Sequence, residues 1–264
     1  MPQLSFISAN YVARAMNYNG VEDWMAHDAA TIQSTNAETF AAVARDVKNA
    51  GFNAIDIWTG HANYAQHDAQ HVADVKRICA EHGLQITSYA GGFSVQKLED
   101  FDAPFEAMGA LGAPIFAGGI SGLPDEELAP LVQAACEKHD VRWGFENHPQ
   151  KTTAEILSKI GNGEYSHCGV ALDTGWCGTQ GLDALEAAKA VREQLFILHL
   201  KDVEAVGGHD TCAVGEGVVP CEAVVKYLLD SGWNGTICIE HEPYNRDPMP
   251  EILRSLERVQ NWIG

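Results

Sequence analysis

Four apolar stretches of this sequence end in side chains that can transfer protons or bind a metal. The stretches contain the runs FENH, LDTG, LHLKD and IEHEP, and their candidate ligands are Glu146, Asp173, His199 and Glu240. If these ends meet, three carboxylates share one partly buried site, and burying unpaired charge is very costly. A divalent cation would supply the missing positive charge. A ligand set of three oxygens and one nitrogen suits Mn²⁺ first, with Mg²⁺, Co²⁺, Fe²⁺ or Zn²⁺ as alternatives.

The elements that would position these residues are short apolar runs that alternate with amphipathic runs of helical period. The predicted strands cover residues 4–10, 53–60, 84–92, 113–119, 142–150, 168–175, 195–202 and 235–243. The predicted helices cover residues 35–51, 70–82, 101–111, 123–140, 152–161, 181–194, 220–232 and 250–264. This alternation implies βα units and a parallel sheet. Eight units predict a single (β/α)8 TIM barrel that forms one domain over residues 1–264, since such barrels usually have about 250 residues.

A doubly wound open sheet is the alternative fold for the same alternation. It is disfavoured because no predicted strand ends in a G-x-G-x-x-G or P-loop pattern. In a TIM barrel the active site lies at the carboxyl ends of the strands, where the four candidate ligands would stand on consecutive strands. Each of them alone is better explained as an isolated polar cap on its strand. Four ligand-type residues on neighbouring strands favour a shared site.

The composition limits the classes of partner. The chain has 36 acidic and 17 basic residues and a formal net charge of -19. Such an acidic protein is not expected to bind nucleic acid or anionic membranes, which require clustered Lys and Arg. No signal peptide or membrane span of about 20 apolar residues is found. The seven cysteines include no C-x-x-C pair, so we expect buried free thiols and a cytoplasmic protein. We also expect a homo-oligomer, with a hetero-oligomer as the alternative.

The motifs FENHP, ALDTGW, HLKD, GEG and IEHEP, in this order, resemble the sugar phosphate isomerase/epimerase superfamily, the xylose isomerase-like TIM barrels. The resemblance extends over essentially the whole chain. It implies that Glu146, Asp173, His199 and Glu240 bind one divalent metal. It also implies that Glu146 and Glu240 move the proton, as the two glutamates do in the family's ketose 3-epimerases. The implied function is an isomerase or epimerase of a small sugar or polyol, in which the metal stabilises the enediolate formed by proton abstraction next to a carbonyl.

Two departures from the ketose 3-epimerases introduce a second functional hypothesis. Trp176 stands where those enzymes usually carry a His, and the segment after His199 lacks their usual Arg. The run HLKDV is instead similar to inosose dehydratases, and the superfamily also contains catalytic subunits of C-glycoside deglycosidases. The alternative is therefore a lyase that catalyses an elimination on an oxo-sugar or oxo-polyol.

Further polar and aromatic residues adjoin the predicted ligands. His148 and Lys201 lie two positions beyond Glu146 and His199, so they share their faces if the strands stay regular. His148 is a candidate general base, and Lys201 a candidate for holding an oxyanion; a supporting role at the rim is equally consistent. Four residues are candidates for binding the substrate, although each also fits a packing or loop role: Trp58, His61, Trp176 and His209.

Two other functional classes are disfavoured. DNA-repair endonucleases share the superfamily, but the acidic composition and the lack of additional metal-binding histidines argue against that activity. A barrel that only binds a partner is disfavoured by the intact set of four candidate ligands.

Overall fold

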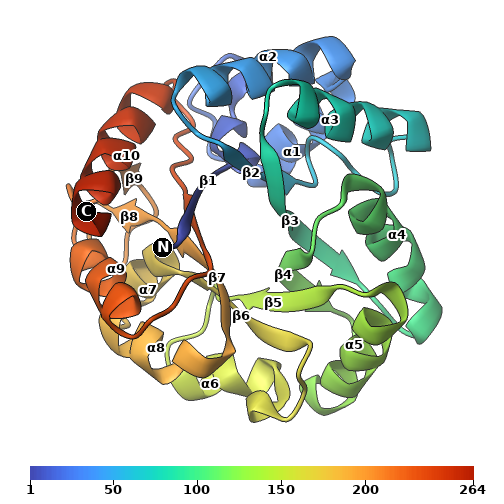
Figure 1. The fold of residues 1–264 in the computed structure, drawn as a ribbon, viewed down its shortest axis with the longest axis vertical. Helices are drawn as coiled ribbons and strands as arrows, with labels where there is room; N and C mark the ends of the chain where they lie inside the picture. The colour runs from blue at the N-terminus through green and yellow to red at the C-terminus, as the bar shows by residue number, and fades with distance from the viewer.

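The computed structural model describes residues 1–264 and shows a closed barrel of eight parallel strands, drawn end-on in Figure 1. The strands of the barrel are β1 (Gln3–Ile7), β2 (Ala54–Trp58), β3 (Gln85–Ser94), β4 (Ile115–Ser121), β5 (Arg142–Glu146), β6 (Cys168–Asp173), β7 (Leu195–Leu200) and β10 (Thr236–Ile239). They follow one another in chain order around the barrel, and β10 closes it against β1. The prediction of a TIM barrel is therefore confirmed.

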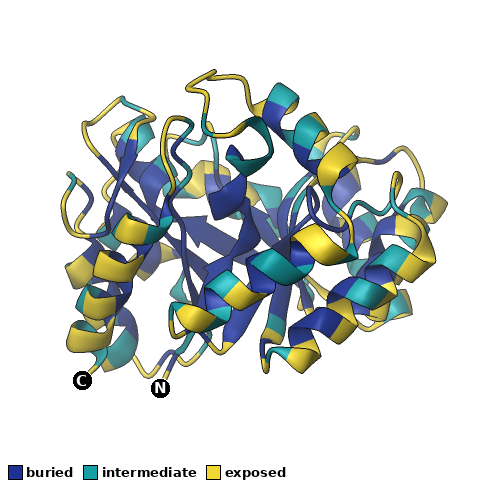
Figure 2. Cartoon of the chain, turned by 90° about the horizontal axis from the view of Figure 1, so that it is seen from above, coloured by how far each residue is buried: buried dark blue, intermediate teal, exposed yellow.

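The helices form an outer ring around the barrel. They are α1 (Trp24–Ser34), α2 (Ala37–Asn49), α3 (Ala69–Glu81), α4 (Asp102–Leu111), α5 (Asp125–His139), α6 (Thr153–Lys159), α7 (Thr174–Gln180), α8 (Ala184–Ala190), α9 (Cys221–Asp230) and α10 (Met249–Ile263). Figure 2 shows the strands buried and the outer faces of the helices exposed. In α2, for example, the buried residues Phe40, Val43 and Val47 recur at helical spacing and face the barrel.

Two layers of apolar side chains hold this arrangement. The larger layer, of 58 buried residues, lies between the strands and the surrounding helices. A smaller cluster includes residues with small side chains on four strands of the barrel: Ala90 on β3, Ala117 on β4, Ala171 on β6 and Cys238 on β10. All seven cysteines are buried and free, which confirms the expectation of buried thiols.

Three elements were not predicted from the sequence. Helix α1 occupies the segment between the first strand and the first predicted helix, and α7 begins directly after β6. A two-stranded antiparallel hairpin, β8 (Asp202–Val203) with β9 (Thr211–Cys212), forms within the loop after β7. The Asp202 carboxylate fixes this loop because it accepts hydrogen bonds from the backbone N–H groups of four residues: Val203, Gly215, Gly217 and Val219.

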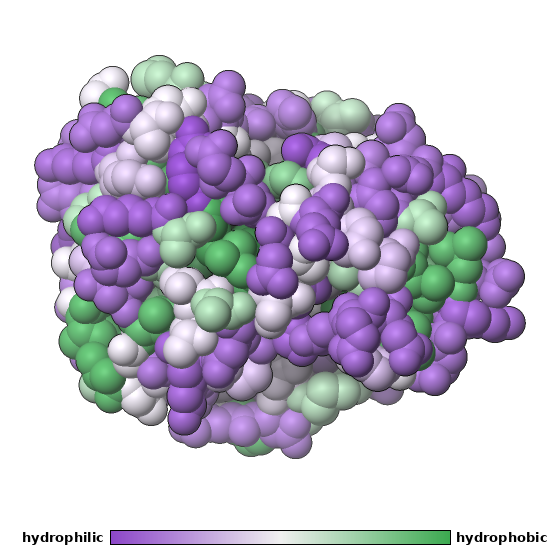
Figure 3. Space-filling view, turned by 90° about the horizontal axis from the view of Figure 1, so that it is seen from below, coloured by the Kyte–Doolittle hydropathy of each residue, from purple (hydrophilic) through white to green (hydrophobic).

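The surface agrees with the acidic composition. Hydrophilic side chains dominate the face drawn in Figure 3, and the hydrophobic ones form separate patches. None of the helices has both the length and the hydropathy needed to cross a membrane.

Candidate active site

The four predicted ligands lie at the carboxyl ends of neighbouring strands. Glu146 is the last residue of β5, and Asp173 the last of β6, where it is in register with His199 on β7. Glu240 follows β10 directly, and its backbone N–H donates to the Leu200 carbonyl at 3.1 Å. The fold thus places all four residues at the same end of the barrel.

The Asp173 carboxylate has two separate tasks. Its Oδ1 accepts a hydrogen bond from the backbone N–H of Trp176 at 3.0 Å and so caps α7, whereas its buried Oδ2 has no hydrogen-bond partner. The side chain of Asn147 pairs with the backbone N–H and carbonyl of Asp173 and holds it in place. Burial raises the pKa of Asp173 to about 6.

Two glutamates converge on one nitrogen of His199. The Nδ1 atom lies 2.5 Å from Glu146 Oε1 and 3.2 Å from Glu240 Oε2. Burial alone would lower the pKa of the fully buried His199, but the carboxylates around it hold that pKa well above its usual value. The negative charge of these carboxylates and their convergence on one point both favour the binding of a cation.

Lys201 provides the positive charge next to this cluster. Its Nζ lies 2.7 Å from Glu240 Oε1, 2.6 Å from Glu242 Oε2 and 3.6 Å from Asp173 Oδ2. Gly175 leaves room for its stem, because a Cβ atom there would lie 2.6 Å from Lys201 Cγ. Burial opposes the charge on Lys201, but the neighbouring carboxylates outweigh it and raise the lysine pKa.

The site fits a divalent cation. Glu146, His199 and Glu240 each offer a ligand atom, and these atoms lie within 4.8 Å of one another. Asp173 is outside that group and connects to it through Lys201. Buried oxygens of Asp173 and Glu240 have no hydrogen-bond partner. Protonated His199 and Lys201 together carry fewer charges than the three carboxylates of Glu146, Asp173 and Glu240. A cation among three carboxylates and an imidazole would meet both needs.

A cavity of 620 Å³ opens directly above the charged cluster. Its lining includes the proposed catalytic side chains Glu146, His148, Lys201 and Glu240. The volume is in the range of about 300–1,000 Å³ typical of small-molecule sites. A second hollow of 510 Å³ shares four lining residues with the first: Gly92, Gly119, Glu146 and His148.

The cavity also contains most of the predicted substrate-binding residues. Trp58, Trp176 and His209 line it. The Trp176 ring lies edge-on against both His148 and His209, with ring centroids 5.2 and 5.1 Å away. His61 does not line the cavity; it is buried beside Trp58, and its Nδ1 lies 3.2 Å from the Ser8 hydroxyl.

The structure adds residues that the sequence analysis did not include in the site. Trp24 on α1 lines the cavity and packs edge-on against Trp58, and Tyr244 lines it after β10. Glu242 lines the cavity and binds Lys201. Asp56, a carboxylate inside the otherwise apolar β2, lies 3.3 Å from His199 Nε2. A charged residue within a buried strand was a signal in the sequence that could have identified Asp56.

Comparisons with known proteins agree with this fold. The family description "Xylose isomerase-like TIM barrel" matches residues 40–262. No curated protein matches the sequence. Among solved structures, L-ribulose 3-epimerase superposes with a TM-score of 0.75 at 16% identity, over 100% of this chain and 95% of that one.

Two further solved structures are similar in fold. The probable 3-DHS dehydratase AsbF of Bacillus anthracis has a TM-score of 0.68 at 14% identity, over 98% of this chain and 99% of that one. The IOLI protein, solved with a zinc atom bound, has a TM-score of 0.67 at 14% identity, over 99% of this chain and 98% of that one. At these identities the structures support the fold alone. The family match covers most of the sequence, and the chain belongs to the xylose isomerase-like TIM barrel family.

Proposed function

We propose that this protein is a divalent-metal-dependent isomerase or epimerase that acts on a small sugar or polyol bearing a carbonyl group. The observation that carries the proposal is the convergence of Glu146 and Glu240 on His199 Nδ1, beneath a cavity of small-molecule size. Two carboxylates that reach one point from different strands suit removal of a proton from carbon and its return.

The metal would be held by Glu146, Asp173, His199 and Glu240. When bound, it would polarise the substrate carbonyl and so make the neighbouring C–H group more acidic. Mn²⁺ is our first choice for this mixed oxygen and nitrogen set, and the zinc in the IOLI protein keeps Zn²⁺ as an alternative.

The protein groups then divide the proton transfer between them. One of Glu146 and Glu240 accepts the proton from carbon, and the other donates from its own side of the cavity. The Lys201 ammonium, between Glu240 and Glu242, is placed to stabilise negative charge on a substrate oxygen. His148 Nε2 lies 3.7 Å from Glu146 Oε2 and adds a second group that can exchange a proton at the cavity wall.

A lyase is the second candidate function, and a specific feature favours it. Elimination requires a proton donor for the leaving hydroxyl in addition to the base, and His148 and Lys201 both line the cavity as such donors. The probable dehydratase of similar fold is consistent with this chemistry. In both candidates the first step is abstraction of a proton next to a carbonyl.

The cavity walls favour a substrate with an apolar face. Trp24 and Trp58 pack against each other, and Trp176 packs against His209, so the cavity presents indole surfaces to its ligand. Aromatic rings bind the apolar face of a sugar or an aglycone ring. We therefore propose a ketone carried on a ring, or a sugar with an apolar substituent, in preference to a simple free ketose.

Isotope exchange tests the proposed function. Mn²⁺-loaded protein is incubated in D₂O with a panel of ketoses, inososes and 3-oxo-glycosides. Deuterium at the carbon next to the carbonyl, in a product that keeps its carbon skeleton and all its hydroxyl groups, indicates an isomerase or epimerase. A dehydrated or cleaved product indicates the lyase. A metal-loaded protein that exchanges no C–H proton in any of these substrates contradicts both candidates.

A further inference from the structure

Asp56 is buried inside the barrel and has no role in the proton transfer described above. It lies in the middle of β2, is 0% exposed, and its register partners are Ile7 on β1 and Ser88 on β3. Burying a carboxylate among apolar strands is costly unless the carboxylate is paired with a charged or hydrogen-bonding group.

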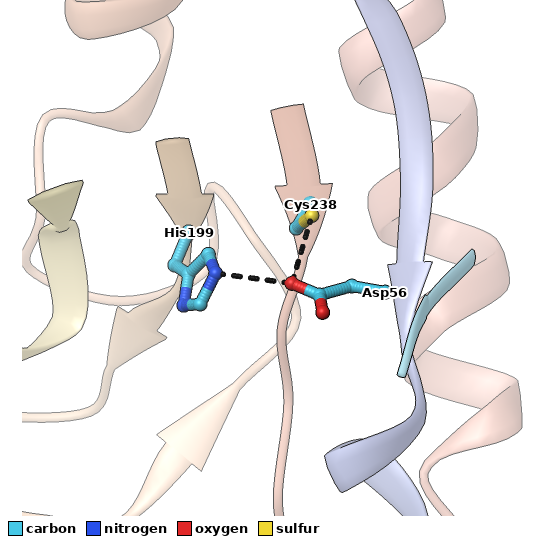
Figure 4. A group of neighbouring side chains, drawn as sticks. All are labelled: Asp56, His199 and Cys238. Carbon is cyan, nitrogen blue, oxygen red and sulfur yellow. Dashed lines mark hydrogen bonds and ion pairs between the residues drawn. The ribbon is translucent and has the colours of Figure 1, made fainter. Parts of the chain in front are cut away.

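The partner of Asp56 is His199, which belongs to the other side of the barrel. Asp56 Oδ2 lies 3.3 Å from His199 Nε2, a close contact in which Nε2 makes no hydrogen bond, and it accepts a hydrogen bond from Cys238 Sγ at 3.7 Å. Figure 4 shows these two contacts and shows the second ring nitrogen of His199 pointing away from Asp56. Cys238 is in register with His199, so the thiol holds the carboxylate next to the imidazole.

The two nitrogens of His199 therefore have different surroundings. Nδ1 faces Glu146 and Glu240, whereas Asp56 is the only carboxylate within 4.0 Å of Nε2. A histidine that binds a metal must present a lone pair, and its other N–H needs an acceptor. Nδ1 carries a proton where it is hydrogen-bonded to Glu146 Oε1, because a carboxylate only accepts. A cation bound among the two glutamates would displace this proton, and the proton left on the ring would lie on Nε2, next to Asp56.

We propose that Asp56 is a positioning residue that selects the Nε2–H tautomer of His199 and thereby strengthens cation binding at Nδ1. This inference rests on the proposed metal-dependent function and goes beyond it, because it assigns a role to a residue that touches neither cation nor substrate. Removing such a carboxylate from behind a ligating histidine typically weakens metal affinity by about 10- to 100-fold.

Metal titration of matched variants tests the inference. We expect Asp56→Ala to raise the Kd for Mn²⁺ by about 10- to 100-fold relative to the wild type. Asp56→Asn keeps a hydrogen-bond acceptor and should fall between the two. Ser88→Ala is the control, since Ser88 is buried in register with Asp56 and its hydroxyl has no hydrogen-bond partner. Its Kd should equal that of the wild type.

A spectroscopic measurement separates positioning from general destabilisation. In Zn²⁺-loaded protein with ¹⁵N-labelled histidine, the wild type should show a metal-bound Nδ1 and a slowly exchanging Nε2–H at His199. Both Asp56 variants should exchange this proton faster, whereas Ser88→Ala should not. Thermal unfolding of the metal-free variants shows whether each one is folded.

The outcomes distinguish this inference from the proposed function. A wild type that binds no divalent metal contradicts the proposed function itself. A wild type that binds metal, with an unchanged Kd in Asp56→Ala, overturns only the role of Asp56. If Asp56→Ala does not fold, an Asp56→Asn variant with wild-type Kd and exchange overturns it. Two metal ions per wild-type chain, falling to one in Cys238→Ser, would also overturn it, because Asp56, His199 and Cys238 would then be ligands themselves.

Discussion

The two halves of the barrel mouth differ in chemistry. The ends of β5, β7 and β10 contribute a cluster of ionisable side chains to the cavity lining: Glu146, His148, Lys201, Glu240 and Glu242. The ends of β1 to β4 contribute none; their lining residues are Ile7, Ala9, Trp58, Thr59, Ala90, Gly91, Gly92 and Gly119. Asp28 on α1 is the one ionisable residue that lines the cavity between β1 and β4. The later half is suited to metal binding and proton transfer, and the earlier half to accommodating the substrate.

This division predicts different consequences of mutation on the two sides. Variants in the charged half should reduce turnover, because they remove groups that exchange protons or stabilise charge. Variants at the uncharged strand ends of the earlier half should mainly change KM and the choice of substrate, because they alter the shape of the cavity. The following predictions test this division, from the largest expected effect to the smallest.

The largest effect is expected from the two glutamates. Glu146→Gln and Glu240→Gln each keep an oxygen ligand but cannot accept a proton, so kcat should fall by about 10²- to 10⁴-fold. Steady-state kinetics on the substrate identified by isotope exchange measure this, with metal content checked by elemental analysis. Near-normal turnover in either metal-loaded variant would exclude that residue as a base.

A smaller loss is expected for Lys201. Lys201→Met preserves the length of the side chain and removes the charge between Glu240 and Glu242. If the ammonium stabilises charge that develops during the reaction, kcat should fall by about 10²- to 10³-fold, with little change in KM. A rise in KM at constant kcat would instead assign Lys201 to the binding of the substrate in its ground state.

The earlier half, with its uncharged strand ends, is tested at Gly119. This residue is in register with Gly92 and borders both hollows, and a Cβ atom added to it meets nothing within 4 Å. Gly119→Val should therefore fold, and should raise KM by about tenfold for 3-oxo-glycosides with a bulky substituent while leaving kcat nearly unchanged. Gly109→Ala on α4, where a Cβ also meets nothing, is the control. Equal kcat and KM in wild type and Gly119→Val would mean that the substrate does not occupy the second hollow.

The smallest effect concerns stability and His61. Burial lowers the pKa of His61 to about 3 from its ordinary 6.5. Between pH 6.5 and 3 the unfolded chain therefore binds a proton at this residue that the folded chain does not bind. The stability contributed by neutral His61 is present above pH 6.5 and is lost as the pH falls. His61→Gln should reduce the slope of unfolding free energy against pH by at most about 1.4 kcal/mol per pH unit. Denaturant unfolding at several pH values measures it, and an unchanged slope would contradict the assignment.

The sequence predicted the barrel well because its strands are separated by clear amphipathic helices. The segments it did not predict lack that pattern. Helix α7, TGWCGTQ, contains two glycines and few strong helix formers, and its first turn is capped by Asp173. Helix α1 buries only His27, Thr31 and Ile32, so its sequence shows no wide apolar stripe.

The site could be predicted in part for a similar reason. Glu146, Asp173, His199 and Glu240 follow apolar strands directly, so the fold rule for barrel ends brings them to one face. Trp24 and Asp56 could not be placed in this way. Trp24 reaches the cavity from a helix that was not predicted, and Asp56 contacts His199 across the barrel interior, three strands away. Contacts of this kind depend on closure of the barrel, which no local sequence pattern describes.

Metal content tests the central claim most directly. Protein purified without chelator is compared with Asp173→Ala and His199→Ala by elemental analysis, after each is shown to be folded. We predict one divalent metal ion per wild-type chain and a strongly reduced content in both variants, since each loses a ligand. Equal metal content in all three proteins, or a wild type that binds no divalent metal when it is supplied, would contradict the account.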